Sequence, residues 1–165
     1  MANVASVKVA PSDAALVVTS IFAIQAVGSL CWALFIPKFK SDRAAYITSL
    51  VIGALGFISI IFIHDKYLLF VSYFLIGFAW AAMLALPFSI LTNALKGTSH
   101  MGEYLGLFNC TICLPQIIAA AVGGLVLKLV GSQAGMLAAA GVLLLCGAVS
   151  VFAIQELKHK PNKNQ

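Results

Sequence analysis

Residues 67–95 read YLLFVSYFLIGFAWAAMLALPFSILTNAL, and no Asp, Glu, Lys or Arg interrupts them. About 20 consecutive apolar residues are enough for an α-helix to cross the hydrocarbon core of a bilayer. This segment is long enough to cross with tilt, and Pro87 inside it predicts a kink. The segment therefore predicts a transmembrane helix and makes the bilayer the solvent of the chain.

Four more segments of the 165-residue chain have the same character. The first is ended by Pro37 and the charged stretch 38–43, because proline continues a helix poorly and charges enter hydrocarbon at high cost. Ser41 or Asp42 is well placed to cap the second helix. We expect an all-α, polytopic membrane helix bundle of five transmembrane helices, at about residues 14–36, 44–63, 67–95, 103–130 and 134–154, between a short extracytoplasmic segment (1–13) and a polar tail (155–165).

Composition excludes several other classes of protein. Apolar residues make up 62% of the chain and charged residues 9%, and the mean hydropathy is +1.04. Soluble domains need charged helix faces, which this chain lacks. The net charge of +5 could suggest nucleic acid, but the basic residues sit at helix ends and in the tail, with no basic stripe along a helix. Nucleic acid is therefore not an expected partner.

The distribution of positive charge predicts the orientation of the chain. Cytoplasmic loops retain Lys and Arg. Five spans place the two termini on opposite sides of the membrane. With the C-terminus in the cytoplasm, that side holds Lys38, Lys40, Arg43, Lys96, Lys158, Lys160 and Lys163, and the other side holds Lys8, Lys66 and Lys128. We expect a multi-pass protein of the cell membrane, a bacterial inner membrane being favoured, with its N-terminus outside.

No set of residues has the pattern of a catalytic site. The acids lie at helix ends or in loops, and no His faces a nucleophile inside a span. Cys110 and Cys113 form a C-x-x-C pair, but no neighbouring His or further Cys supports a metal or redox role, so packing is the favoured interpretation. The sequence predicts neither an enzyme, nor a metal site, nor a cofactor.

Polar and aromatic residues repeat at a spacing of about seven, which places them on one helix face two turns apart. An amide at membrane depth needs a partner, so these faces should point inward. In a water-filled solute cavity, amides would bond to sugar hydroxyls and an indole would stack on the apolar face of the sugar; otherwise the same residues join helices. The faces comprise Gln25, Ser29 and Trp32; Tyr73, Gly77, Trp80, Leu84 and Pro87; and Asn109 and Gln116. Trp32, near a helix end, fits an interfacial anchor better, whereas Trp80 is mid-span.

The order of these features resembles a known family. Residues 80–91 read WAAMLALPFSIL and residues 102–118 read GEYLGLFNCTICLPQII. With the KFKSDR loop at 38–43, they resemble the last five helices of the major facilitator superfamily, specifically sugar–proton symporters related to plant sucrose carriers and bacterial maltose carriers. The resemblance covers nearly the whole chain after about residue 14.

The resemblance implies a partial C-terminal half, with the five spans as helices eight to twelve. Such carriers have two six-helix halves around a midplane site. Gln25, Trp80, Asn109 and Gln116 would then bind the sugar, which we expect to be an α-glucoside such as maltose or sucrose. Asp42 and Arg43 would form a gating pair, although the loop lacks the glycine and the second arginine of the family's G-x-x-x-D-R-x-x-R signature.

A coupling carboxylate is absent from the middle of every span, so a proton symporter would need other helices. We therefore expect as partners the lipid bilayer, a small-molecule sugar, and either the missing N-terminal helices or a second copy. The alternative hypothesis is a small membrane scaffold or assembly subunit without a solute path.

Overall fold

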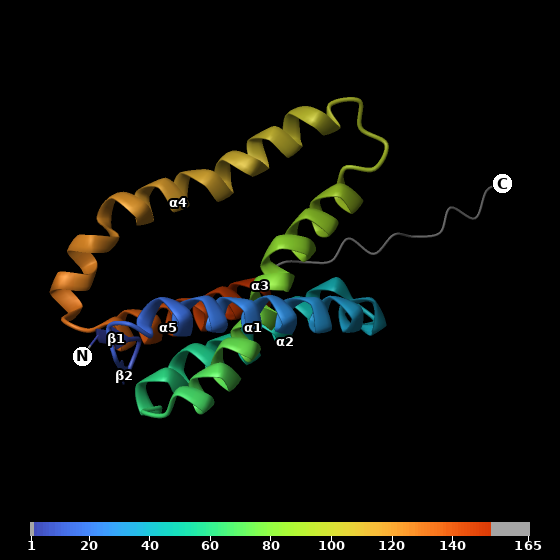
Figure 1. Ribbon diagram of the computed structural model, residues 1–165. Helices are drawn as coiled ribbons and strands as arrows, with labels where there is room; N and C mark the ends of the chain where they lie inside the picture. The colour runs from blue at the N-terminus through green and yellow to red at the C-terminus, as the bar shows by residue number, and fades with distance from the viewer. Residues whose placement is uncertain (1, 153–165) are drawn as a thin grey trace.

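The computed structural model describes residues 2–152, and within them five helices are long and apolar enough to cross a membrane (Figure 1). They are α1 (Ala14–Phe35), α2 (Asp42–Ser59), α3 (Lys66–Ala94), α4 (Met101–Val130) and α5 (Gln133–Phe152). Two 3-10 turns, η1 (Ile36–Lys38) and η2 (Ile60–Phe62), extend α1 and α2. The all-α membrane fold class is confirmed. The expected tail, residues 155–165, lies outside the described residues.

Local side chains explain where the helices begin and end. Ser41 caps α2 by accepting a hydrogen bond from the Ala44 N–H, and Asp65 caps α3 by accepting one from the Tyr67 N–H at 2.7 Å. Gly131 ends α4 in the left-handed conformation with φ of 74°, which glycine adopts without steric cost. These signals keep the connections between helices short.

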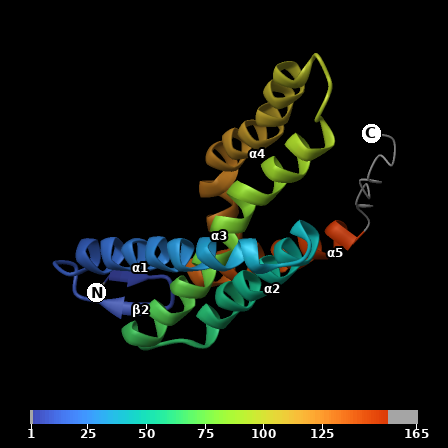
Figure 2. The same ribbon diagram turned by 90° about the vertical axis from the view of Figure 1, so that its right-hand side faces the viewer.

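Helix α3 is the centre of the packing, with α1 and α2 against it and α5 against α2 (Figure 1, Figure 2). Small residues allow the backbones to approach. A Cβ on Gly77 would lie 2.3 Å from the Gln25 carbonyl oxygen of α1, and one on Gly53 would lie 2.2 Å from the Ala79 Cβ. In lipid, where the hydrophobic effect does not drive helices together, such close packing is a main source of association.

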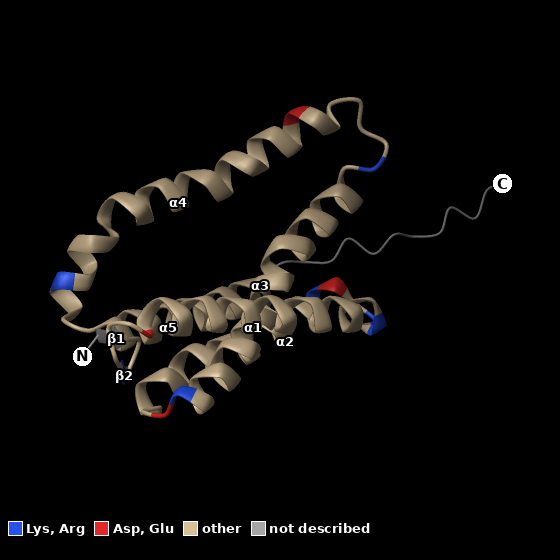
Figure 3. Ribbon diagram, in the orientation of Figure 1, with Lys and Arg blue, Asp and Glu red and all other residues tan. Residues whose placement is uncertain are grey.

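Helix α4 stands apart from this bundle. Figure 1 and Figure 2 show it leaving the end of α3 and returning to the start of α5, and it has no buried residue. Charged residues lie at helix ends and connections, and the middles of the helices carry none (Figure 3). A bilayer would thus meet apolar helix surface in its core and charge at its faces.

An antiparallel hairpin of β1 (Ala2–Val4) and β2 (Val7–Val9) precedes the helices. Val4 and Val7 are buried against the ends of α1, α2 and α3, in a cluster that includes Ile21 and Ile60. The Ala5 N–H donates to the Gln133 Oε1 at 3.1 Å, which joins the hairpin to α5. The sequence did not indicate this element, because strands this short show no clear alternation and are stabilised by the helices beneath them.

Candidate functional site

The polar face of α1 packs against α3, and Ser29 on this face forms a hydrogen bond between the two helices. The Ser29 hydroxyl donates to the Gly77 carbonyl oxygen at 2.9 Å and is 3.0 Å from the Gln25 carbonyl oxygen of its own helix. Gly77 offers this carbonyl because its missing side chain lets α1 approach. Ser29 is thus a helix-joining residue. The Gln25 side chain on the same face is half-buried and has no hydrogen-bond partner within residues 2–152.

Trp32 of α1 contacts both α2 and α3. Its indole N–H donates to the Ser49 hydroxyl of α2 at 2.7 Å. Its ring stacks on Phe78 of α3, with centroids 4.3 Å apart and planes inclined by 9°, and meets the edge of Phe39. The sequence favours an interfacial anchor for Trp32, but the structure gives it an interhelical hydrogen bond and a stacking partner. One face of this indole is therefore already occupied.

Trp80 differs from Trp32 in its surroundings. It is 50% exposed on α3, and in the described part of the chain it has neither a hydrogen bond nor an aromatic partner. Its neighbour Ala79 is fully buried against Gly53 of α2, which places the two residues on different faces of α3. The indole of Trp80 is therefore available to a group that is not part of this bundle.

The amides of α4 are also exposed. Asn109 and Gln116 lie on the helix that stands apart, and neither has a hydrogen-bond partner among the described residues. The structure does not bring them together with Gln25 and Trp80 in one cavity. The sequence indicates that an amide at membrane depth faces inward, whereas here the other helices do not cover α4 (Figure 1).

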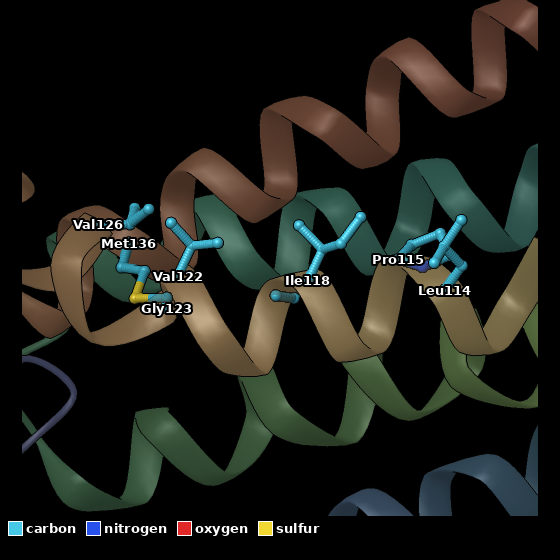
Figure 4. Close-up of a pocket in the computed structure, with 8 residues that line it drawn as sticks. Leu114, Pro115, Ile118, Val122, Gly123, Val126 and Met136 are labelled. Atoms are coloured by element: carbon cyan, nitrogen blue, oxygen red, sulfur yellow. The ribbon is translucent and has the colours of Figure 1, made fainter.

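A cavity of about 440 Å³ lies between α4 and the start of α5. Figure 4 shows its lining, which is entirely apolar: Leu114, Pro115, Ile118, Ala119, Val122, Gly123, Val126 and Met136. A sugar site needs hydrogen-bonding groups that fix the hydroxyls, and none lines this cavity. The cavity is not the predicted sugar site.

A second cavity, of about 390 Å³, lies beside strand β2 of the hairpin, and both polar and apolar residues line it. It is formed by β2, the start of α1 and the turn between α2 and α3, and its polar residues are Lys8, Asp13, His64, Asp65, Lys66 and Tyr67. The sequence did not indicate it, since residues from three separate segments meet there. Within residues 2–152 no group of three His, Cys, Asp or Glu residues is placed to hold a metal ion.

The predicted gating residue Asp42 contacts another helix. It is half-buried at the first turn of α2, and its Oδ2 accepts a hydrogen bond from the Ser89 hydroxyl of α3 at 3.1 Å. Arg43 beside it is also half-buried. Ser89 was missed from the sequence, although antiparallel packing of α2 and α3 places the end of one span beside the start of the other.

Comparison with known proteins identifies the family. The model of the Major Facilitator Superfamily matches residues 3–165. No curated protein and no solved structure matches the chain. The match extends over all five helices, whose length and apolar character suit a multi-pass membrane protein. The chain therefore belongs to the Major Facilitator Superfamily and is a membrane transporter protein, not an enzyme.

Proposed function

We propose that this chain is part of a secondary active transporter that moves a sugar, an α-glucoside such as maltose or sucrose, across the cell membrane with proton coupling. The observation that carries the proposal is the contrast between the two tryptophans. Trp32 is bonded and stacked within the bundle, whereas Trp80 presents a half-exposed indole at mid-span with no partner in residues 2–152.

An indole without a protein partner suits a sugar, because the apolar face of a pyranose ring stacks on an aromatic surface. Amides suit the sugar's hydroxyls, since one amide both donates and accepts hydrogen bonds. Gln25, Asn109 and Gln116 carry such groups in the spans. In this proposal they surround the sugar once further helices bring α4 against the bundle.

Proton coupling needs a carboxylate at membrane depth, and the middles of these five helices carry none. Asp13, Asp42, Asp65 and Glu103 all lie at helix ends or in connections. A carboxylate from other helices would take the proton, supplied by the N-terminal helices of a full carrier or by a second copy. In this arrangement the N-terminus is outside and the C-terminus is cytoplasmic, in accord with the excess of Lys and Arg on the inner side.

The test is uptake of radiolabelled maltose and sucrose into proteoliposomes that contain the chain together with the remaining helices of its carrier. We expect uptake driven by an inward proton gradient. Trp80→Ala should weaken apparent sugar affinity about tenfold, since it removes a large stacking surface. Phe88→Ala is the matched control, because Phe88 is also 50% exposed on α3.

Equal effects of the two substitutions would refute the role of Trp80. No uptake of either sugar, at normal abundance in the membrane, would refute the proposal that this transporter moves an α-glucoside.

A further inference from the structure

The cavity beside β2 has walls that the hairpin contacts hold in place. Strand β2 and the turn before α3 both line it. The Ser6 hydroxyl donates to the Ile63 carbonyl oxygen, directly before that turn, and the Ala5 N–H donates to the Gln133 Oε1 of α5. Val7 of β2 is only 5% exposed. The hairpin is therefore fixed on the helix ends, and the cavity of about 390 Å³ is formed without a ligand.

Two lysines line this cavity without a carboxylate partner. Lys8 belongs to β2 and Lys66 is the first residue of α3, and both are exposed. In the part of the chain that the structure describes, neither ammonium lies within 4.0 Å of a carboxylate oxygen. The Lys66 Nζ lies 5.2 Å from the centroid of the Tyr67 ring, a contact that uses none of its N–H donors in a hydrogen bond. Each ammonium can give three hydrogen bonds, which suits a phosphate group.

Two carboxylates of the same cavity retain free acceptor capacity. The Asp65 Oδ1 accepts a hydrogen bond from the Tyr67 N–H at 2.7 Å, and the Asp13 Oδ1 accepts one from the Ser12 hydroxyl at 3.0 Å. A carboxylate has two oxygens and accepts several hydrogen bonds, so each can accept another donor. With His64 neutral, the two aspartates balance the two lysines. The cavity therefore suits a group with one negative and one positive end better than a simple anion.

The cavity lies at the level of the membrane surface. Asp13 directly precedes α1 and Lys66 begins α3, and both helices are long and apolar enough to cross a membrane. Figure 3 shows charged residues at the start of α3 and beside the hairpin, at the same end of the bundle. Tyr67 is 67% exposed there, in the position of an interfacial anchor. Val7 and Val17 add apolar lining. Phospholipid headgroups occupy this level of a bilayer.

We propose that this cavity binds the headgroup of phosphatidylethanolamine, a zwitterionic phospholipid with a primary ammonium. The phosphate lies between Lys8 and Lys66, and the ammonium donates hydrogen bonds to Asp13 and Asp65. Because one lysine and one aspartate come from each of two segments, the lipid joins the N-terminal segment to the turn before α3. The site does not depend on the proposed sugar.

The experiment is native mass spectrometry of the full chain in detergent, titrated with phosphatidylethanolamine, phosphatidylcholine and phosphatidylglycerol of the same acyl chains. Phosphatidylethanolamine should bind about tenfold more tightly than phosphatidylcholine, whose quaternary ammonium has no N–H to donate. The double variant Lys8→Gln, Lys66→Gln should bind phosphatidylethanolamine about tenfold more weakly, because it loses two charged contacts at the membrane surface.

A second double variant tests the ammonium end of the site. Asp13→Asn, Asp65→Asn should abolish the preference for phosphatidylethanolamine over phosphatidylcholine. It should not weaken binding of phosphatidylglycerol, which has no ammonium, and this arm shows that the variant is folded. Loss of the preference with phosphatidylglycerol binding retained supports the assignment of the two aspartates. A preference that survives the substitution overturns it.

The matched control is Lys40→Gln, Lys96→Gln, which removes the same charge from two exposed lysines outside the cavity. It should leave phosphatidylethanolamine binding unchanged. The proposal is overturned if the two lysine double variants weaken binding equally, or if the unaltered chain binds phosphatidylethanolamine and phosphatidylcholine equally. It is also overturned if inorganic phosphate at the same concentration displaces the lipid, because the cavity would then be a site for free phosphate.

Discussion

Substitution of Gly77 by alanine tests the close crossing of α1 and α3. The added Cβ would lie 2.3 Å from the Gln25 carbonyl oxygen and 2.8 Å from the Ser29 backbone nitrogen. Both contacts are with backbone, which cannot turn aside as a flexible side chain does. To reach even 3.0 Å from the oxygen, the two helices must separate by about 0.7 Å.

The loss of stability follows from two effects. Overpacking of this kind costs about 1–3 kcal/mol. The separation also weakens the bond from the Ser29 hydroxyl to the Gly77 carbonyl oxygen, and a polar contact between membrane helices contributes about 0.6 kcal/mol on average. We expect Gly77→Ala to lower the free energy of unfolding by about 1.5–3.5 kcal/mol.

The assay is unfolding of the purified chain in mixed micelles by increasing SDS, followed by circular dichroism. Gly106→Ala on α4 is the matched control, since a Cβ placed there would meet no atom within 4 Å other than the backbone around it in its own helix. The control should be neutral or slightly stabilising, because alanine favours helix more than glycine. An equal unfolding midpoint for Gly77→Ala and Gly106→Ala would refute the close crossing.

Three further predictions concern topology, binding and packing. A membrane-impermeant thiol reagent should label His64→Cys in intact cells but Ser99→Cys only after permeabilisation; the reverse pattern would contradict the orientation inferred from positive charge. Gln116→Leu should weaken apparent sugar affinity only several-fold in uptake assays, because one neutral hydrogen bond contributes about 0.5–1.5 kcal/mol net, and an unchanged affinity with reduced abundance would make Gln116 a packing residue. Trp32→Phe removes the donor to the Ser49 hydroxyl, so the same SDS assay should show a loss of about 1 kcal/mol, and no change would show that this bond is not formed in micelles.

Much of the fold could be predicted from the sequence because the membrane restricts the choices. Without water in the bilayer core, an apolar segment of this length must satisfy its own backbone polar groups, and a helix does so. Residues 67–95 therefore indicated α3 without any knowledge of its neighbours. The hairpin at Ala2–Val9 was not predictable in this way, because its buried valines depend on helix ends that are distant in sequence.

The candidate site was less accessible to sequence reasoning. The spacing of seven correctly placed Ser29 and Trp32 on a face that contacts other helices, yet it could not distinguish a residue that joins helices from one that would face a solute. The partners decide between these roles, and Gly77, Ser49 and Phe78 come from helices whose packing no local pattern specifies. The same holds for Ser89, because its hydrogen-bond partner, Asp42, lies in a different helix.

The sequence by itself determined that this protein lies in a lipid bilayer, and it determined the five helices and their approximate limits, because hydrophobicity and capping act within a few residues. The tertiary structure alone decided that Trp32 forms a hydrogen bond to another helix whereas Trp80 is half exposed. It also decided that Asp42 bonds to Ser89 and that α4 lies outside the bundle. These outcomes depend on which helix surfaces fit closely together. In lipid that fit comes from backbone approach at small residues such as Gly77 and Gly53 and from interhelical hydrogen bonds, and both join residues far apart in the chain.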